Sequence, residues 1–135
     1  MRIKKNVAAF IEWERISRVG TVGKSGMPHV VPVCHVFSAG KIYFASDRGA
    51  RKLQNLRANP RVALTVDGYS DVWSNLKGAM VQGTAAIVER GPRFKKVRAL
   101  LYRKYPQYPD QAAIGERDSA IVEVTPKRVF AWGLE

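Results

Sequence analysis

The sequence predicts a mainly β protein, an antiparallel split β-barrel of about six strands in a Greek-key-like order, with two or three helices on its outside. Short segments of period-two alternation recur along the chain. Segments of helical period interrupt them without the regular alternation that a parallel sheet requires. The 135 residues, 46% of them hydrophobic, suit one domain, which we expect to span residues 1–135.

The first half of the chain switches between the two periods. Apolar residues from Val7 to Ile16 recur at helical spacing, whereas the stretch after Pro28 is rich in valine, as strands are. Leu53 and Leu56 return to helical spacing before an Asn-Pro stop. In order, these patterns predict a helix over residues 4–18, a strand over 19–22, a turn over 23–26, strands over 29–37 and 42–46, and a helix over 49–59.

The second half repeats this alternation. Val62, Leu64 and Val66 lie on one face of a strand. The helical stretch that follows has an apolar stripe, formed by Phe94, Val97, Leu100 and Leu101. In order, the patterns predict a strand over residues 61–67, a polar connection over 71–77, a strand over 80–89, a helix over 92–105, a loop over 107–118, and a last strand over 120–124 that bends at Pro126 and resumes over 129–132.

Trp13, Tyr102 and Tyr105 lie on predicted helices, and Tyr108 lies in the predicted loop that follows. We expect Trp13 to anchor the first helix to the core. Tyr102, Tyr105 and Tyr108 are interleaved with cations, a pattern that single-stranded nucleic acid can use for stacking. We favour packing of these tyrosines onto the barrel.

The formal net charge of +12 draws the chain toward anions such as nucleic acid, acidic membrane surfaces or phosphorylated small molecules. The charge alone does not choose among them. Cys34 is the one cysteine, so an intrachain disulfide and a cysteine metal cage are excluded, and we expect a small buried side chain there. The apolar run over residues 7–11 is too short for an export segment or a membrane span. We expect a cytoplasmic protein with no membrane partner.

The stretch from Ser46 to Lys52 joins a strand to a helix and carries an unusual charge pattern. Ser46 or Asp47 is the expected N-cap. Arg51 and Lys52 then fall in the first helical turn, where the helix dipole disfavours each cation by roughly 0.3–1 kcal/mol. A bound anion reverses this cost, because backbone N–H groups, the dipole and both side chains converge on it. The alternative, that both side chains point into solvent, stays open.

Several motifs in a fixed order resemble the FMN-binding split-barrel superfamily, which includes the pyridoxamine 5'-phosphate oxidase-like proteins and the F420-dependent reductases. The resemblance covers most of the chain from about Ile16 onward. It is carried by residues 26–33 (GMPHVVPV), 42–46 (IYFAS), 51–56 (RKLQNL), 59–64 (NPRVAL), 81–85 (VQGTA) and 125–129 (TPKRV).

The resemblance implies a homodimer with FMN, or alternatively F420, bound between its two chains. Ser46, Arg51 and Lys52 match the positions that hold the cofactor phosphate. The strand with Val31, Pro32 and Val33 matches the one whose backbone runs along the flavin ring. The remaining positions implied are Gly78 and Ala79, where a strand begins beside the ring, and Trp73 or Trp132 from the partner subunit.

The resemblance further implies an oxidoreductase that transfers hydride between the bound cofactor and a small-molecule substrate. The chain ends at residues 131–135 (AWGLE) without the basic, histidine-containing motif of authentic pyridoxamine 5'-phosphate oxidases, so we do not expect oxidation of vitamin B6. Two alternatives stay open, a flavin or haem carrier or sensor, and a basic barrel that binds nucleic acid. We expect no specific nucleic-acid partner and no metal site. We also expect no catalytic acid or base, because the cofactor itself performs the bond changes.

Overall fold

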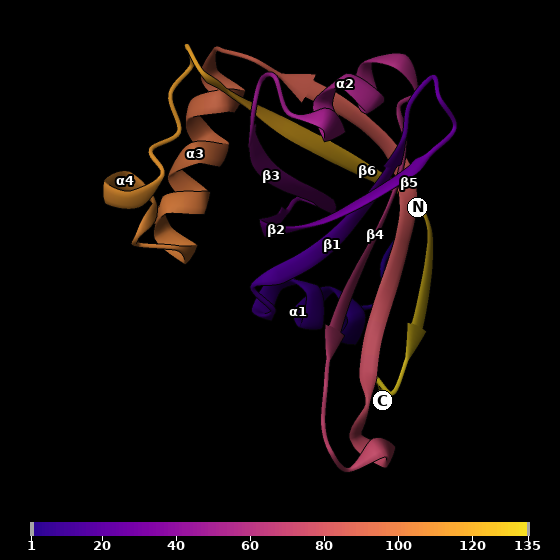
Figure 1. Cartoon of the computed structure of the whole chain (residues 1–135). Helices are drawn as coiled ribbons and strands as arrows, with labels where there is room; N and C mark the ends of the chain where they lie inside the picture. The colour runs from indigo at the N-terminus through magenta and orange to yellow at the C-terminus, as the bar shows by residue number, and fades with distance from the viewer. Residues whose placement is uncertain (1, 135) are drawn as a thin grey trace.

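The fold of this computed structural model is a closed barrel of six antiparallel strands in the order β1-β2-β3-β6-β5-β4, which confirms the predicted split-barrel class (Figure 1). The structure describes residues 2–134. The elements are α1 (Lys5–Trp13), β1 (Ile16–Val22), β2 (Pro28–Ser38), β3 (Lys41–Asp47), α2 (Arg51–Ala58), β4 (Arg61–Gly68), the 3-10 helix η1 (Trp73–Asn75), β5 (Lys77–Val88), α3 (Pro92–Lys104), α4 (Tyr108–Gln111) and β6 (Ser119–Trp132).

The main core fills the interior of the barrel. Alternate residues of the strands point inward. Val19, Phe44 and Leu64 are examples, and each is at most 1% exposed. Ile11 of α1 and Leu53 of α2 are fully buried in the same cluster. Burial of each such side chain contributes about 1.5–3 kcal/mol, so both helices are held to the barrel by their apolar stripes.

A second apolar layer lies outside the barrel, beneath α3. Phe94 and Leu101 of α3 pack in one cluster with Tyr43 of β3 and Ile121 of β6. Figure 1 shows α3 and α4 together on this side of the molecule. The predicted packing of the tyrosines is confirmed, because Tyr105 is 2% exposed and its two neighbours pack partly buried against this cluster. Tyr105 is therefore not available to stack on a base.

The N-terminal helix is shorter than predicted. It ends at Trp13, and residues from Ile16 onward join the barrel by pairing with β2. The prediction that Trp13 anchors this helix is wrong, because its side chain is 81% exposed. The helix buries Val7, Phe10 and Ile11 at the spacing of one face, and position 13 falls off that face.

Three other segments differ from the predictions. The connection over residues 71–77 contains η1, and the predicted loop over 107–118 contains α4. The last strand does not break at Pro126 but runs from Ser119 to Trp132, with a register shift against β5 at Gln82/Gly83.

Cys34 is half-buried, and burial raises the pKa of its thiol. No helix of residues 2–134 is long and apolar enough to cross a bilayer.

Candidate functional site

The barrel is split between β2 and β3. The two strands pair only from His35 to Ser38 on β2, opposite Phe44 to Lys41 on β3. Before His35, β2 pairs with β1 alone, and after Phe44, β3 pairs with β6 alone. One edge of β2 and one edge of β3 therefore face each other without a common hydrogen-bond ladder.

Pro32 shows which backbone groups face the split. A proline has no N–H, so it stands in a strand only where its nitrogen faces an unpaired edge. Since Pro32 is opposite Arg18 in the β1 pairing, its nitrogen and carbonyl face away from β1 and into the split. Alternation places the N–H and C=O of Val30 on the same edge and those of Val31 and Val33 toward β1. Val30 therefore also supplies a free backbone donor and acceptor, although the predicted site residues did not include it.

Helix α2 begins at the open end of this split, directly after β3. Leu53 and Leu56 are buried in the core, and Asn55 donates a hydrogen bond of 3.0 Å to the Thr21 hydroxyl on β1. These contacts hold α2 against β1 and fix the direction in which its first turn points. Arg51 and Lys52 form that turn.

The expected N-cap is wrong: Ala50 holds this position, and no side chain caps the helix. The turn after β3 is long enough to place Ser46 and Asp47 outside the helix, where the Asp47 carbonyl accepts the Ala50 N–H at 3.1 Å. Ser46 is 8% exposed and donates to that same carbonyl at 3.1 Å. The first turn therefore presents backbone N–H groups to whatever binds there.

Both cations of the first turn are available to an anion. Within residues 2–134 neither Arg51 nor Lys52 forms an ion pair within 4.0 Å. Arg51 is exposed, and Lys52 is half-buried. Burial lowers the pKa of Lys52, and the nearby Asp47 carboxylate acts in the opposite direction. An uncapped helix start with two free cations fits a phosphate group.

Arg48 has a different role from its neighbours. Its guanidinium donates to the Glu89 carboxylate at 2.5 Å, to the Glu89 carbonyl at 2.8 Å and to the Ser119 carbonyl at 3.0 Å, and it also bonds the carbonyl of Glu116. It points toward β5 and the start of β6. This clamp holds the turn that places α2, a function that the run of cations in the sequence did not reveal.

The other predicted site residues gather at the far end of β5 and β6. Gly78 is paired with Trp132, whose indole occupies the space that a Cβ would need, 2.4 Å from the nearest ring atom. Ala79 is fully buried. Trp73 is 73% exposed on η1, at the tip of the arm that β4 and β5 form below the barrel (Figure 1).

The predicted residues therefore form two groups that one chain does not bring together. Ser46 pairs with Ala120 at the start of β6, and Gly78 pairs with Trp132 at its end. Twelve residue-to-residue steps along β6 separate these two pairs, which corresponds to roughly 40 Å along a regular strand. Val31 to Val33, Ser46, Arg51 and Lys52 make up the first group, and Trp73, Gly78, Ala79 and Trp132 the second.

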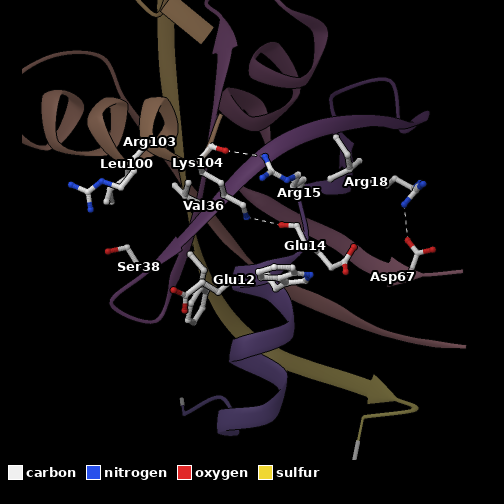
Figure 2. A pocket seen from close by; sticks show the side chains of 13 residues that line it. Glu12, Glu14, Arg15, Arg18, Val36, Ser38, Asp67, Leu100, Arg103 and Lys104 are labelled. Atoms are coloured by element: carbon white, nitrogen blue, oxygen red, sulfur yellow. Dashed lines mark hydrogen bonds and ion pairs between the residues drawn. The ribbon is translucent and has the colours of Figure 1, made fainter. Parts of the chain in front are cut away.

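A cavity of about 790 Å³ opens on the outer surface, between the end of α1, the start of β1, the end of β2 and α3 (Figure 2). None of the residues of either group lines it. Lys104 lies on its wall and donates to the Glu14 carbonyl at 2.6 Å. Arg15 donates in return to the Lys104 carbonyl at 2.9 Å. Figure 2 shows these two hydrogen bonds and the Arg18–Asp67 ion pair of 2.6 Å beside them.

A second cavity, of about 750 Å³, crosses the outer face of β1, β4 and β5. Gly20 and Ala63 are among the residues that line it. The lining also contains Arg61, Lys127 and Arg128, and no acidic residue among residues 2–134. Among residues 2–134, no three histidine, cysteine or carboxylate side chains gather as a metal site.

Comparison with known proteins gives both a family and a fold. A family model described as pyridoxamine 5'-phosphate oxidase matches residues 3–133. The 5a,11a-dehydrotetracycline/5a,11a-dehydrooxytetracycline reductase of Streptomyces rimosus is 28% identical over 134 residues, which cover 93% of this chain and 80% of that protein.

Two solved structures show the same fold at lower identity. The haem storage protein HutZ of Vibrio cholerae has a TM-score of 0.82 and 20% identity, over 99% of this chain and 97% of that one. A protein named F420 reductase has a TM-score of 0.77 and 19% identity, over 95% of this chain and 98% of that one. The two solved structures, one named a haem storage protein and one a reductase, therefore share one barrel fold with this chain.

Proposed function

Because the chain belongs to the pyridoxamine 5'-phosphate oxidase family, we propose that it is an oxidoreductase that uses bound FMN, or alternatively F420, to transfer hydride to or from a small-molecule substrate. The observation that carries this proposal is the split itself. An open strand edge on β2 faces the start of α2, whose first turn has no cap and two cations without ion pairs. A phosphate joined to a flat heterocycle fits that combination.

In this proposal each part of the split has one task. The first turn of α2 binds the cofactor phosphate through its N–H groups, Arg51 and Lys52. The free backbone groups of Val30 and Pro32 orient the polar edge of the ring. Arg48 keeps the turn in place through Glu89 and Ser119. The cofactor supplies the hydride chemistry, and the protein supplies binding and orientation.

We infer a homodimer from the separation of the two groups. Gly78 and Trp132 lie at the opposite end of β6 from Ser46, so they reach a cofactor in the split only from a partner subunit. The exposed side chains of Tyr69, Val72 and Trp73 on the β4–β5 arm supply apolar surface for such a contact. Each of two sites would then combine the first group of one chain with the second group of the other.

Two alternative functions are a non-catalytic haem carrier and a barrel that binds nucleic acid. A non-catalytic haem carrier needs an axial ligand, but His35 is fully buried and its Nε2 lies 2.8 Å from the Ile11 carbonyl oxygen. His35 is therefore not available as that ligand, and the half-buried His29 is the histidine that remains. Binding of nucleic acid would rest on surface cations, so we expect it to be weak and to fall steeply with salt.

A parallel titration with FMN and with F420, followed by quenching of cofactor fluorescence, tests the proposal. Lys52→Glu should weaken binding of the preferred cofactor by at least about tenfold, since it replaces a phosphate-binding cation with an anion that repels the phosphate. Lys95→Glu, an equal charge reversal on the exposed face of α3, is the matched control and should leave affinity unchanged. Tight binding of one cofactor would also identify it. No binding of either, or equal effects of both variants, would remove the assignment.

A further inference from the structure

We propose that the cavity beside Lys104 is a second small-molecule site, in which the Lys104 amine forms an imine with an aromatic aldehyde or ketone. The site does not depend on the flavin-type function, because the cavity contains none of the residues of the split.

The cavity has the walls that an aromatic ligand needs. Its apolar lining comes from the end of α1, β1, β2 and α3, and consists of Trp13, Ile16, Val36, Phe37 and Leu100. Trp13 is 81% exposed although it is the largest apolar side chain at the site. A ligand ring that covered this indole would remove apolar surface from water on both partners.

Lys104 is held at the wall by backbone rather than by a carboxylate. Its Nζ donates to the Glu14 carbonyl at 2.6 Å, and Arg15 and Tyr105 brace the same turn through hydrogen bonds to the carbonyls of Lys104 and Arg15. Within residues 2–134, no carboxylate oxygen lies within 4.0 Å of this nitrogen. The ammonium form therefore has the Glu14 carbonyl and the Tyr105 ring, whose centroid is 5.5 Å away, beside it in place of a carboxylate.

Burial of Lys104 favours the free amine. Burial, followed by the charge of Arg15, lowers the pKa of Lys104 to about 8, whereas Glu12, Cys34 and Glu14 act in the opposite direction. At pH 7.5 roughly a quarter of such amines are unprotonated, against roughly one in a thousand for an ordinary lysine. A lysine desolvated beside another cation is the usual form of an imine-forming nucleophile.

The reaction involves no oxidant or reductant. The Nζ lone pair attacks the carbonyl carbon and forms a C–N bond, while the carbonyl oxygen takes up a proton. Loss of that oxygen as water, with a proton from the nitrogen, leaves the C=N bond. Amine and aldehyde thus give imine and water.

Trapping with benzaldehyde and sodium cyanoborohydride at pH 7.5 tests the proposal on the full wild-type chain. Digestion and mass spectrometry give the rate of N-benzylation at each lysine. Lys104 should react at least about tenfold faster than Lys95 and Lys96, which are exposed on the same helix. Its rate should saturate with benzaldehyde concentration. Equal rates at the three lysines would overturn the proposal.

A variant separates a binding site from a merely reactive amine. Trp13→Ala should raise the benzaldehyde concentration at half-saturation several-fold and leave labelling by formaldehyde, which has no ring, unchanged. Trp13 is exposed, so the variant should fold. Fast labelling of Lys104 without saturation, or without an effect of Trp13→Ala, would contradict the site. Cofactor titration of the same samples keeps this result apart from the fate of the flavin-type function.

Discussion

His35 shows at the scale of one residue how burial decides the chemistry of a side chain. Its ring is fully buried, with Nε2 2.8 Å from the Ile11 carbonyl oxygen and no partner for Nδ1 in the part of the chain described. Burial is the main cause that lowers the pKa of His35 from 6.5 to about 4. The ring is therefore neutral in the folded protein at neutral pH.

This depressed pKa predicts a loss of stability in mild acid. Between pH 6.5 and about 4 the unfolded chain binds a proton at His35 that the folded chain does not, so the free energy of unfolding falls as the pH falls through this window. The total is about 3 kcal/mol. Urea denaturation at several pH values should show the wild-type slope reduced in His35→Gln and kept in His29→Gln. Identical slopes in all three proteins would contradict this role of His35.

Some residues of the site could be predicted from local sequence, and others could not because their partners are distant in the sequence. The charge pattern placed Arg51 and Lys52 at a helix start, because dipole and sequence position are both local properties. The same pattern did not distinguish Arg48, whose partners Glu89 and Ser119 are distant in sequence. Lys104 was missed for the same reason, since its hydrogen-bond partner Glu14, directly after α1, lies ninety residues earlier in the sequence.

At the scale of elements, hydrophobic period predicted every strand of the barrel, whereas the ends of elements depended on pairing. The first helix stops at Trp13 because Ile16 to Arg18 pair with β2, and this competition between helix and ladder is not local. The predicted bend at Pro126 became a register shift, because the long β5 continues beside β6 on both sides of it.

Gly83 makes that register shift possible. A Cβ at this position would lie 2.1 Å from the Thr125 carbonyl oxygen and 3.1 Å from the Pro126 Cα, and these backbone atoms cannot move without breaking the β5–β6 ladder. Gly83→Ala should therefore lower the free energy of unfolding by about 1–3 kcal/mol. Gly115→Ala, where a Cβ meets no atom within 4 Å, is the control. Equal denaturation midpoints for the two variants would show that the ladder adjusts.

At the scale of the whole molecule, the barrel places the two groups of predicted site residues at opposite ends of β6. The order of motifs along the chain predicted both groups, but no pattern in one sequence measures the distance between them. That distance implies that two subunits contribute to each site in the proposed assembly. If one chain supplies the start of α2 and its partner supplies Trp132, a defect in either group damages the same kind of site from different subunits.

Mixed dimers test this arrangement. Lys52→Glu and Trp132→Ala should each weaken cofactor binding as homodimers, because every site contains the altered residue. In a heterodimer of the two variants, one site combines both defects and the other combines Lys52 of the Trp132→Ala chain with Trp132 of the Lys52→Glu chain. The second site is intact, so co-expressed and purified heterodimers should bind one cofactor per dimer with wild-type affinity. If each chain instead formed its whole site alone, every site would carry one defect, and fluorescence titration would recover no tight binding.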